Sequence, residues 1–261
     1  MKKTIVASLS LALAAVIAAN AQDVRTRRTR PDAHSKPSGG IVEKPYSGNY
    51  IKIVNAQKTV ANDVIKTFVL KMRMETLLPF EACTGEHVDV DVAKSIAEQL
   101  VKETRVGAGI LIIDDPTRDA HIQSAEGRWA ILNISPLKTD SPATKTLETR
   151  CAKMLWRAAA RALGVGYAAR EASVLKPFST LAELDSNREL KPSPDGSNAM
   201  LQNASVYGIT PLTIASYRTA CRNGWAPAPT NEVQKAIWEQ ICAEKERGPA
   251  NALQIPMPKK K

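Results

Sequence analysis

Long apolar segments, aromatic residues and histidines are scarce in this chain of 261 residues. Phe, Tyr and Trp make up 5% of it, and beyond the N-terminus no apolar run reaches the ~20 residues that a membrane-spanning helix needs. The three histidines, His34, His87 and His121, have separations that match no metal-binding motif. A Gly-x-Ser-x-Gly elbow, a phosphate-binding loop, a dinucleotide fingerprint and an Asp-Thr/Ser-Gly pair are all absent. The sequence therefore does not predict the enzyme classes that these motifs mark.

Residues 1–21 have the composition of a secretory signal peptide. Two lysines precede an apolar stretch over residues 5–19, and Ala19-Asn20-Ala21 is a small-residue cleavage site. The apolar stretch is too short to span a bilayer, and no Cys follows the cleavage site to carry a lipid anchor. We therefore expect a mature chain that begins at Gln22 and is soluble in the periplasm or secreted.

The formal net charge of +10 is concentrated at the two ends of the chain. After removal of the two signal-peptide lysines, residues 22–40 contribute +3 and the three C-terminal lysines another +3, which leaves +2 for the folded body. Basic tails attract anionic surfaces such as acidic glycans, although a terminal charge run is more often simply solvated. This distribution argues against nucleic-acid binding.

Four cysteines occur in the sequence, at Cys83, Cys151, Cys221 and Cys242. An even number after a signal peptide favours two disulfides, although four cysteines allow three pairings. We favour Cys221–Cys242, because both residues lie on consecutive predicted helices, and by elimination Cys83–Cys151. A zinc cluster is disfavoured because no two of these cysteines lie within a few residues of each other.

Strands and helices alternate over about 200 residues, which predicts one α+β domain with a mixed sheet, a central helix and a helical C-terminal extension. Strands are expected at 50–54, 107–115 and 128–135, and helices at 60–78, 92–104, 144–163, 210–221 and 230–245. Residues 22–44 are expected to be a disordered basic linker, 45–186 the core, and 187–261 the extension with its basic tail, beginning with a loop over 186–197.

The helix at 144–163 contains the spacing of a metzincin zinc site, in which two His residues flank a Glu and a third His follows a Gly. The corresponding positions are Arg157, Ala158, Arg161, Gly164 and Tyr167. Residues 50–186 resemble the archaemetzincin branch in particular. The upstream strands at 107–115 and 128–135 match that pattern, and Ala168, Ser173 and Leu175 stand at its two Cys and its Met positions. The resemblance implies a metzincin-like core with a two-lobed cleft but without the HExxHxxGxxH zinc site.

Arginine cannot replace a zinc-bound imidazole, because a guanidinium stays protonated and has no lone pair to donate. Arg157 and Arg161 therefore predict that the chain has no catalytic residue, metal or cofactor here, and Ala158 cannot act as a general base. Two roles are left for Arg157, Arg161 and Tyr167. They either bind an anion such as a carboxylate or a sulfated sugar, or make structural ion pairs. The candidate partners are Glu171, Glu183 and Asp185, and we favour this structural role.

The leading hypothesis is an exported metzincin-like protein without catalytic zinc that acts as a binding or structural pseudo-peptidase. An anionic glycan or an acidic protein is the expected partner, with no nucleic acid and no membrane span. The alternative is an active extracellular peptidase that cleaves protein or mucin-type glycoprotein through a non-classical carboxylate or metal site. A third hypothesis is an envelope protein that its basic tails fix to anionic surfaces. The sequence leaves the oligomeric state open.

Overall fold

The computed structural model describes residues 39–56, 58–85, 88, 90–124, 127–167 and 173–246. The chain divides into two compact units: one spans Tyr46–Leu212, and the other joins the chain up to Pro45 with the chain from Thr213. The predicted signal peptide and most of the predicted linker lie outside the described residues. Within the described ranges, no helix is both long and apolar enough to cross a membrane.

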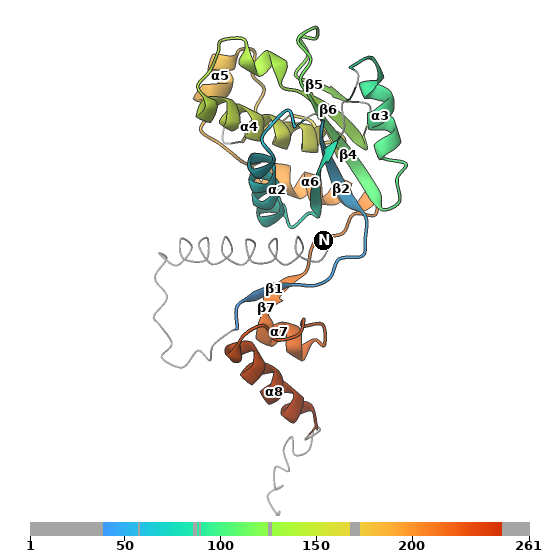
Figure 1. Ribbon diagram of the computed structural model, residues 1–261, viewed down its shortest axis with the longest axis vertical. Coiled ribbons are helices and arrows are strands. Elements are labelled where there is room, and N and C mark those ends of the chain that lie inside the picture. The colour runs from blue at the N-terminus through green and yellow to red at the C-terminus, as the bar shows by residue number, and fades with distance from the viewer. Residues whose placement is uncertain are drawn as a thin grey trace, which may run out of the picture. The chain divides into compact units, whose positions relative to one another are not determined.

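The larger unit is built on a five-stranded sheet in the order β3-β2-β4-β6-β5 (Figure 1). Four strands are parallel: β2 (Tyr50–Ala56), β3 (Phe80–Gly85), β4 (Val106–Ile113) and β6 (Trp129–Asn133). The edge strand β5 (Ile122–Ser124) runs antiparallel to β6. Parallel neighbours need crossover connections, and α2 (Asn62–Thr76) and α3 (Ala93–Leu100) lie in two of these. This mixed sheet with its helices confirms the predicted α+β class.

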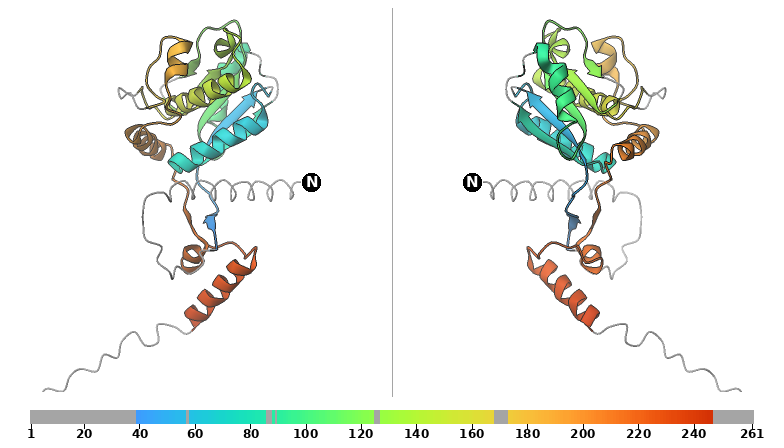
Figure 2. Two further views of the ribbon diagram at one scale, coloured as in Figure 1. Left: turned by 90° about the vertical axis from the view of Figure 1, so that its left-hand side faces the viewer. Right: turned by 90° about the vertical axis from the view of Figure 1, so that its right-hand side faces the viewer.

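Helices cover both faces of this sheet, because successive side chains of a strand point to opposite sides. Ile110 and Ile112 of β4 pack with α2 and α4 (Thr144–Ala162), whereas Leu111 and Ile113 pack with α3. Figures 1 and 2 show α3 on the face opposite to α2 and α4. All eight residues of β4 are buried, which explains why this strand reads as an uninterrupted apolar run.

The long helix α4 forms where the sequence predicts it. Four alanines in its second half are at most 1% exposed, so their small side chains allow the helix to lie close to the sheet. Trp156 meets Phe80 of β3 edge to face, with ring centroids 6.5 Å apart. The helix ends at Ala162 and is followed by Gly164, whose φ of +70° suits glycine, and the Val165 amide donates to the Ala160 carbonyl over 2.8 Å.

The chain after α4 adds two helices to the larger unit, α5 (Leu181–Ser186) and α6 (Pro194–Val206). The predicted loop over 186–197 is therefore wrong in its second half, because Ser193 caps α6 and Pro194 occupies its first position. Met200 and Ala204 of α6 are fully buried in the core that α4 also lines. The core unit consequently extends to Leu212 and not, as predicted, only to residue 186.

The smaller unit contains a two-stranded antiparallel sheet of β1 (Ile41–Glu43) and β7 (Ile214–Ser216), followed by α7 (Tyr217–Arg222) and α8 (Glu232–Glu246). Tyr217, Cys221, Ile237 and Ile241 form its core. Residues 41–43 are therefore a strand and not part of a disordered linker. The helix predicted at 210–221 begins only at Tyr217, because the chain first forms β7 and Ser216 supplies the cap.

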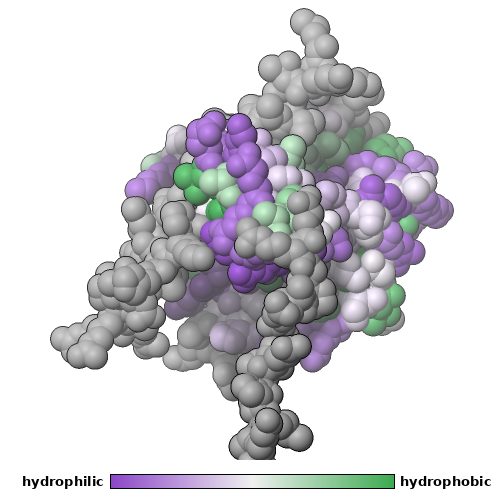
Figure 3. All heavy atoms as spheres, turned by 90° about the horizontal axis from the view of Figure 1, so that it is seen from below, coloured by the Kyte–Doolittle hydropathy of each residue, from purple (hydrophilic) through white to green (hydrophobic). Residues whose placement is uncertain are grey.

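The face of the molecule drawn in Figure 3 is mostly hydrophilic where it is coloured, and its apolar patches are small and separate. Large apolar side chains with substantial exposure are scattered along the described chain and include Leu77, Leu190, Val206 and Trp238. Isolated apolar residues of this kind are ordinary on protein surfaces and do not by themselves mark a docking site.

All four cysteines are free thiols in this structure. The predicted pairing Cys83–Cys151 is not formed, and its two residues lie on different sides of the sheet. Ala82 of β3 faces the core shared with α4, so its neighbour Cys83 points to the opposite side of the sheet, whereas Cys151 is buried on α4. Cys221 and Cys242 lie on α7 and α8, whose side chains share one core. The disulfide Cys221–Cys242 stays a prediction.

Candidate functional site

Three buried cations lie on one face of α4, and we call them the cationic stripe: Arg150, Lys153 and Arg157. Their spacing of three and four positions places them on the same side of a helix. Each is only 2% exposed, although Arg and Lys are rarely so buried without partners. Segment 173–189, which contains α5, lies against this face and supplies most of those partners.

Arg150 forms the most extensive set of contacts in the stripe. Its guanidinium forms paired hydrogen bonds with Asp140, at 2.6 and 2.7 Å, and with Asp185, at 2.9 and 2.6 Å. It also donates to the Leu137 carbonyl over 2.8 Å. These hydrogen bonds raise the pKa of Arg150 and hold the pKa of both carboxyls below their usual range.

Lys153 holds α5 through backbone atoms. Its ammonium donates to the carbonyls of Leu184 and Asn187, each over 2.6 Å. Burial lowers the pKa of Lys153, and the nearby carboxylate of Asp185 opposes that shift. Arg150 and Lys153 thus attach both the side chain of Asp185 and the C-terminal end of α5 to the central helix.

We predict that Arg150→Ala lowers the free energy of unfolding by about 2–4 kcal/mol, because it leaves two carboxylates and one buried carbonyl without their donor. Chemical denaturation monitored by circular dichroism measures the change. Lys191→Ala is the matched control, because the Lys191–Glu75 pair is exposed on both sides and should contribute no more than about 1 kcal/mol. Equal losses in the two variants would contradict the role given to Arg150.

Arg157 differs from the other two cations because no carboxylate pairs with it among the described residues. One of its terminal nitrogens donates to the carbonyl of Lys176. Its guanidinium carbon lies 4.6 Å from the ring centroid of Phe178 and 5.4 Å from that of Tyr167, both within cation–π range. Its buried Nε has no hydrogen-bond partner in the described chain. Burial lowers the pKa of Arg157, but an arginine stays protonated at neutral pH.

The carboxylates that the sequence offered as partners of Arg157 are engaged elsewhere. Asp185 pairs with Arg150, and Glu183 accepts a hydrogen bond from the backbone amide of Ser179 over 2.6 Å. Glu171 lies outside the described residues. The predicted structural ion pair of Arg157 with Glu183 or Asp185 is therefore wrong. Asp185 bonds to Arg150, and Glu183 bonds to the backbone just before α5.

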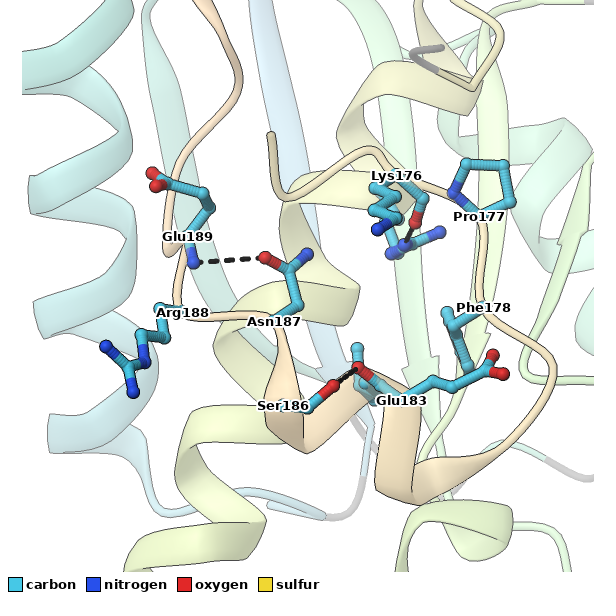
Figure 4. A pocket seen from close by; sticks show the side chains of 10 residues that line it. Lys176, Pro177, Phe178, Glu183, Ser186, Asn187, Arg188 and Glu189 are labelled. Atoms are coloured by element: carbon cyan, nitrogen blue, oxygen red, sulfur yellow. Dashed lines mark hydrogen bonds between the residues drawn. The ribbon is translucent and has the colours of Figure 1, made fainter. Parts of the chain in front are cut away.

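Arg157 lines a cavity of about 570 Å³. The rest of the wall comes from segment 176–189 and includes Lys176, Phe178, Glu183, Asn187, Arg188 and Glu189. Figure 4 shows Lys176, Pro177 and Phe178 on one side of this cavity and Arg188 and Glu189 on the other. The volume falls in the range of small-molecule binding sites, which is roughly 300–1,000 Å³. A buried cation therefore lines a space large enough for a ligand.

Arg161 and Tyr167 lie next to Arg157, as predicted, but they are more exposed. The guanidinium carbon of Arg161 is 5.6 Å from the Tyr167 ring centroid, so both arginines lie within cation–π range of this tyrosine. Tyr167 is 53% exposed, and neither residue lines the cavity. The structure thus brings Arg157, Arg161 and Tyr167 together, while only Arg157 among these three lines the cavity.

His121 joins this group although the sequence gave no reason to connect it with the arginines. Its ring meets Phe178 edge to face at 5.6 Å between centroids, on the residue that Arg157 also contacts. Its buried Nε2 has no hydrogen-bond partner in the described chain. Burial lowers the pKa of His121, and the positive charge of Arg157 lowers it further.

We predict that the protein loses stability as the pH falls from about 7.5 to about 5.5, partly through His121. Because the folded-state pKa of His121 lies below its unfolded value, the unfolded chain takes up more protons as the pH falls through about 6.5. His121→Gln should flatten the dependence of the unfolding free energy on pH, and His34→Gln should not. Asp140 and Asp185 affect the unfolding free energy at lower pH. Because their pKa values are lowered in the folded state, the stability that they contribute is lost only below about pH 3.8. Equal slopes in both variants would contradict this role of His121.

No known protein-family model matches the sequence, and no curated protein matches it. Among solved structures, the chain is similar to the archaemetzincin of Methanopyrus kandleri, with a TM-score of 0.50 and 14% identity over 60% of this chain and 96% of that one. It also matches a zinc-dependent peptidase from Methanocorpusculum labreanum, with a TM-score of 0.46 and 11% identity over 57% of this chain and 99% of that one.

The likeness to the Methanopyrus kandleri structure confirms an archaemetzincin-like α+β fold. At 14% identity it shows the fold alone, and the activity of that enzyme does not transfer with it. Within the described part of the chain, no group of three or more His, Cys, Asp or Glu residues is placed to hold a metal ion.

Proposed function

We propose that this protein is an exported, metzincin-like binding protein without catalytic zinc, and that Arg157 holds an anionic ligand. The residue chemistry at the positions of the zinc ligands supports the first part. Arg157 and Arg161 offer no lone pair, and Ala158 is fully buried and has no polar atom to act as a base. These residues do not fit a zinc ion.

The surroundings of Arg157 support the second part. A desolvated cation is unfavourable unless it is paired and fully hydrogen-bonded. In the described chain Arg157 has one carbonyl acceptor, two aromatic faces and no carboxylate. A guanidinium forms its strongest hydrogen bonds with planar or tetrahedral oxyanions. The observation that carries this proposal is a buried arginine, with no carboxylate partner in the described chain and its Nε donor unused, in the wall of a cavity of about 570 Å³.

We predict that the purified mature protein contains no stoichiometric zinc. Elemental analysis after purification without chelator measures this, and zinc added to the apo protein should not raise its melting temperature. One tightly held zinc ion per chain, with three or four protein ligands, would instead favour the alternative hypothesis of an active peptidase. A peptidase assay with and without chelator is the companion measurement.

We predict that sulfate or a simple carboxylate raises the melting temperature of the wild type and that Arg157→Ala removes this effect. A ligand at ten times its Kd stabilises the folded state by about 1.4 kcal/mol. Arg157→Lys should keep the charge but weaken binding, because an ammonium lacks the planar fork of donors. Lys191→Ala removes an exposed cation outside the cavity and should leave the shift unchanged. An anion effect that survives in Arg157→Ala would contradict the proposal.

A further inference from the structure

We infer that the cavity at Arg157 takes a zwitterionic ligand, with a carboxylate on Arg157 and a cationic group on Glu183 or Glu189. The inference rests on the proposed function and adds a second recognition element to the same cavity. It narrows the ligand class from anions in general to amino acids or peptide ends that carry a basic group.

The wall of the cavity carries charges of both signs. Glu183 and Glu189 line it together with the basic residues Lys176 and Arg188. Figure 4 shows Glu183 beside Phe178 on one side of the cavity and Glu189 on the other. A polyanion such as a sulfated glycan would bring further negative charge toward these two carboxylates, whereas a cationic group would be attracted to them. The wall thus offers carboxylates for a cationic group as well as Arg157 for a carboxylate, which suits a ligand that carries both charges.

Both carboxylates have lone pairs free for a ligand. Glu183 uses one oxygen to accept from the Ser179 amide, at 2.6 Å. Glu189 hydrogen-bonds through its backbone amide, which donates to the Asn187 side chain over 3.1 Å. Across the described residues, neither carboxylate forms an ion pair. An ionised carboxylate offers about four acceptor positions, so an ammonium group can bind either residue without displacing a protein contact.

Apolar groups lie between the two kinds of charge. Pro177, Phe178 and Leu184 contribute to the wall, so an alkyl segment that joins a carboxylate to an ammonium group has hydrophobic surface to cover. Arg157 is buried at 2% exposure and fixed by Lys176 and Phe178, which makes it the anchor for the carboxylate. The cationic end of the ligand then faces the more exposed glutamates.

The test compares ligands that differ only in their ammonium group. Isothermal titration calorimetry with the full mature chain measures the Kd of 6-aminohexanoate against hexanoate, and of 4-aminobutanoate against butanoate for a shorter span. We expect the amino acid of at least one pair to bind about tenfold more tightly than its partner, because it adds a charge-assisted hydrogen bond. In the double variant Glu183→Gln/Glu189→Gln the two members of that pair should bind within about twofold of each other. Glutamine at position 183 retains an acceptor for the Ser179 amide.

Glu81→Gln serves as the control, because Glu81 is exposed on β3 and does not line the cavity. It should keep the wild-type preference for the amino acids. Equal affinities within both ligand pairs, or a preference that persists in a folded double variant, would overturn the inference. In the first of these cases, binding of hexanoate or sulfate that depends on Arg157 would still leave the proposed function standing. Absence of such binding for every probe would overturn both.

Discussion

The buried cationic stripe on α4 is the constraint on which the site depends. Arg150, Lys153 and Arg157 are each 2% exposed, so segment 173–189 must fold over them and supply oxygen atoms. Asp185 and the carbonyls of Leu184 and Asn187 do this for the first two cations. The position of α5, and with it one wall of the cavity, follows from these contacts. The third cation receives a single carbonyl, and it also lines the cavity.

The elements that the sequence predicts well are strands in which every residue is buried and helices whose apolar residues recur at a regular spacing. β4, β6 and α4 carry long apolar patterns, and the structure places them as expected. β3 was missed because it is an edge strand in which only Phe80 is fully buried. The sequence does not predict α6, although Ser193 and Pro194 form an ordinary helix start signal, because the polar residues around them favour a loop. At this point the polar composition of the segment hides the helix-capping signal of Ser193.

The sequence predicts which residues of the candidate site lie together, but it does not predict which hydrogen-bond partner each of them has. The helical spacing placed Arg157, Arg161 and Tyr167 together, and the structure agrees. Sequence could not decide which arginine takes Asp185, because Arg150 and Arg157 lie seven positions apart on one helix face and both are plausible. His121 was invisible for a different reason: it approaches Phe178 only through the packing of the β5 region on segment 173–189.

Hydrogen bonding is uneven along the face of α4 that carries the cationic stripe, so Arg150 and Arg157 are in different environments. Arg150 has its full complement of acceptors, so its contribution is structural and its loss should be felt in the free energy of unfolding. Arg157 keeps a buried donor unused and depends on two aromatic rings, an arrangement that tolerates the charge without neutralising it. An anion that enters the cavity would complete its hydrogen bonds and also relieve its repulsion of His121. Ligand binding and proton uptake at His121 are then linked by the same charge, each favouring the other.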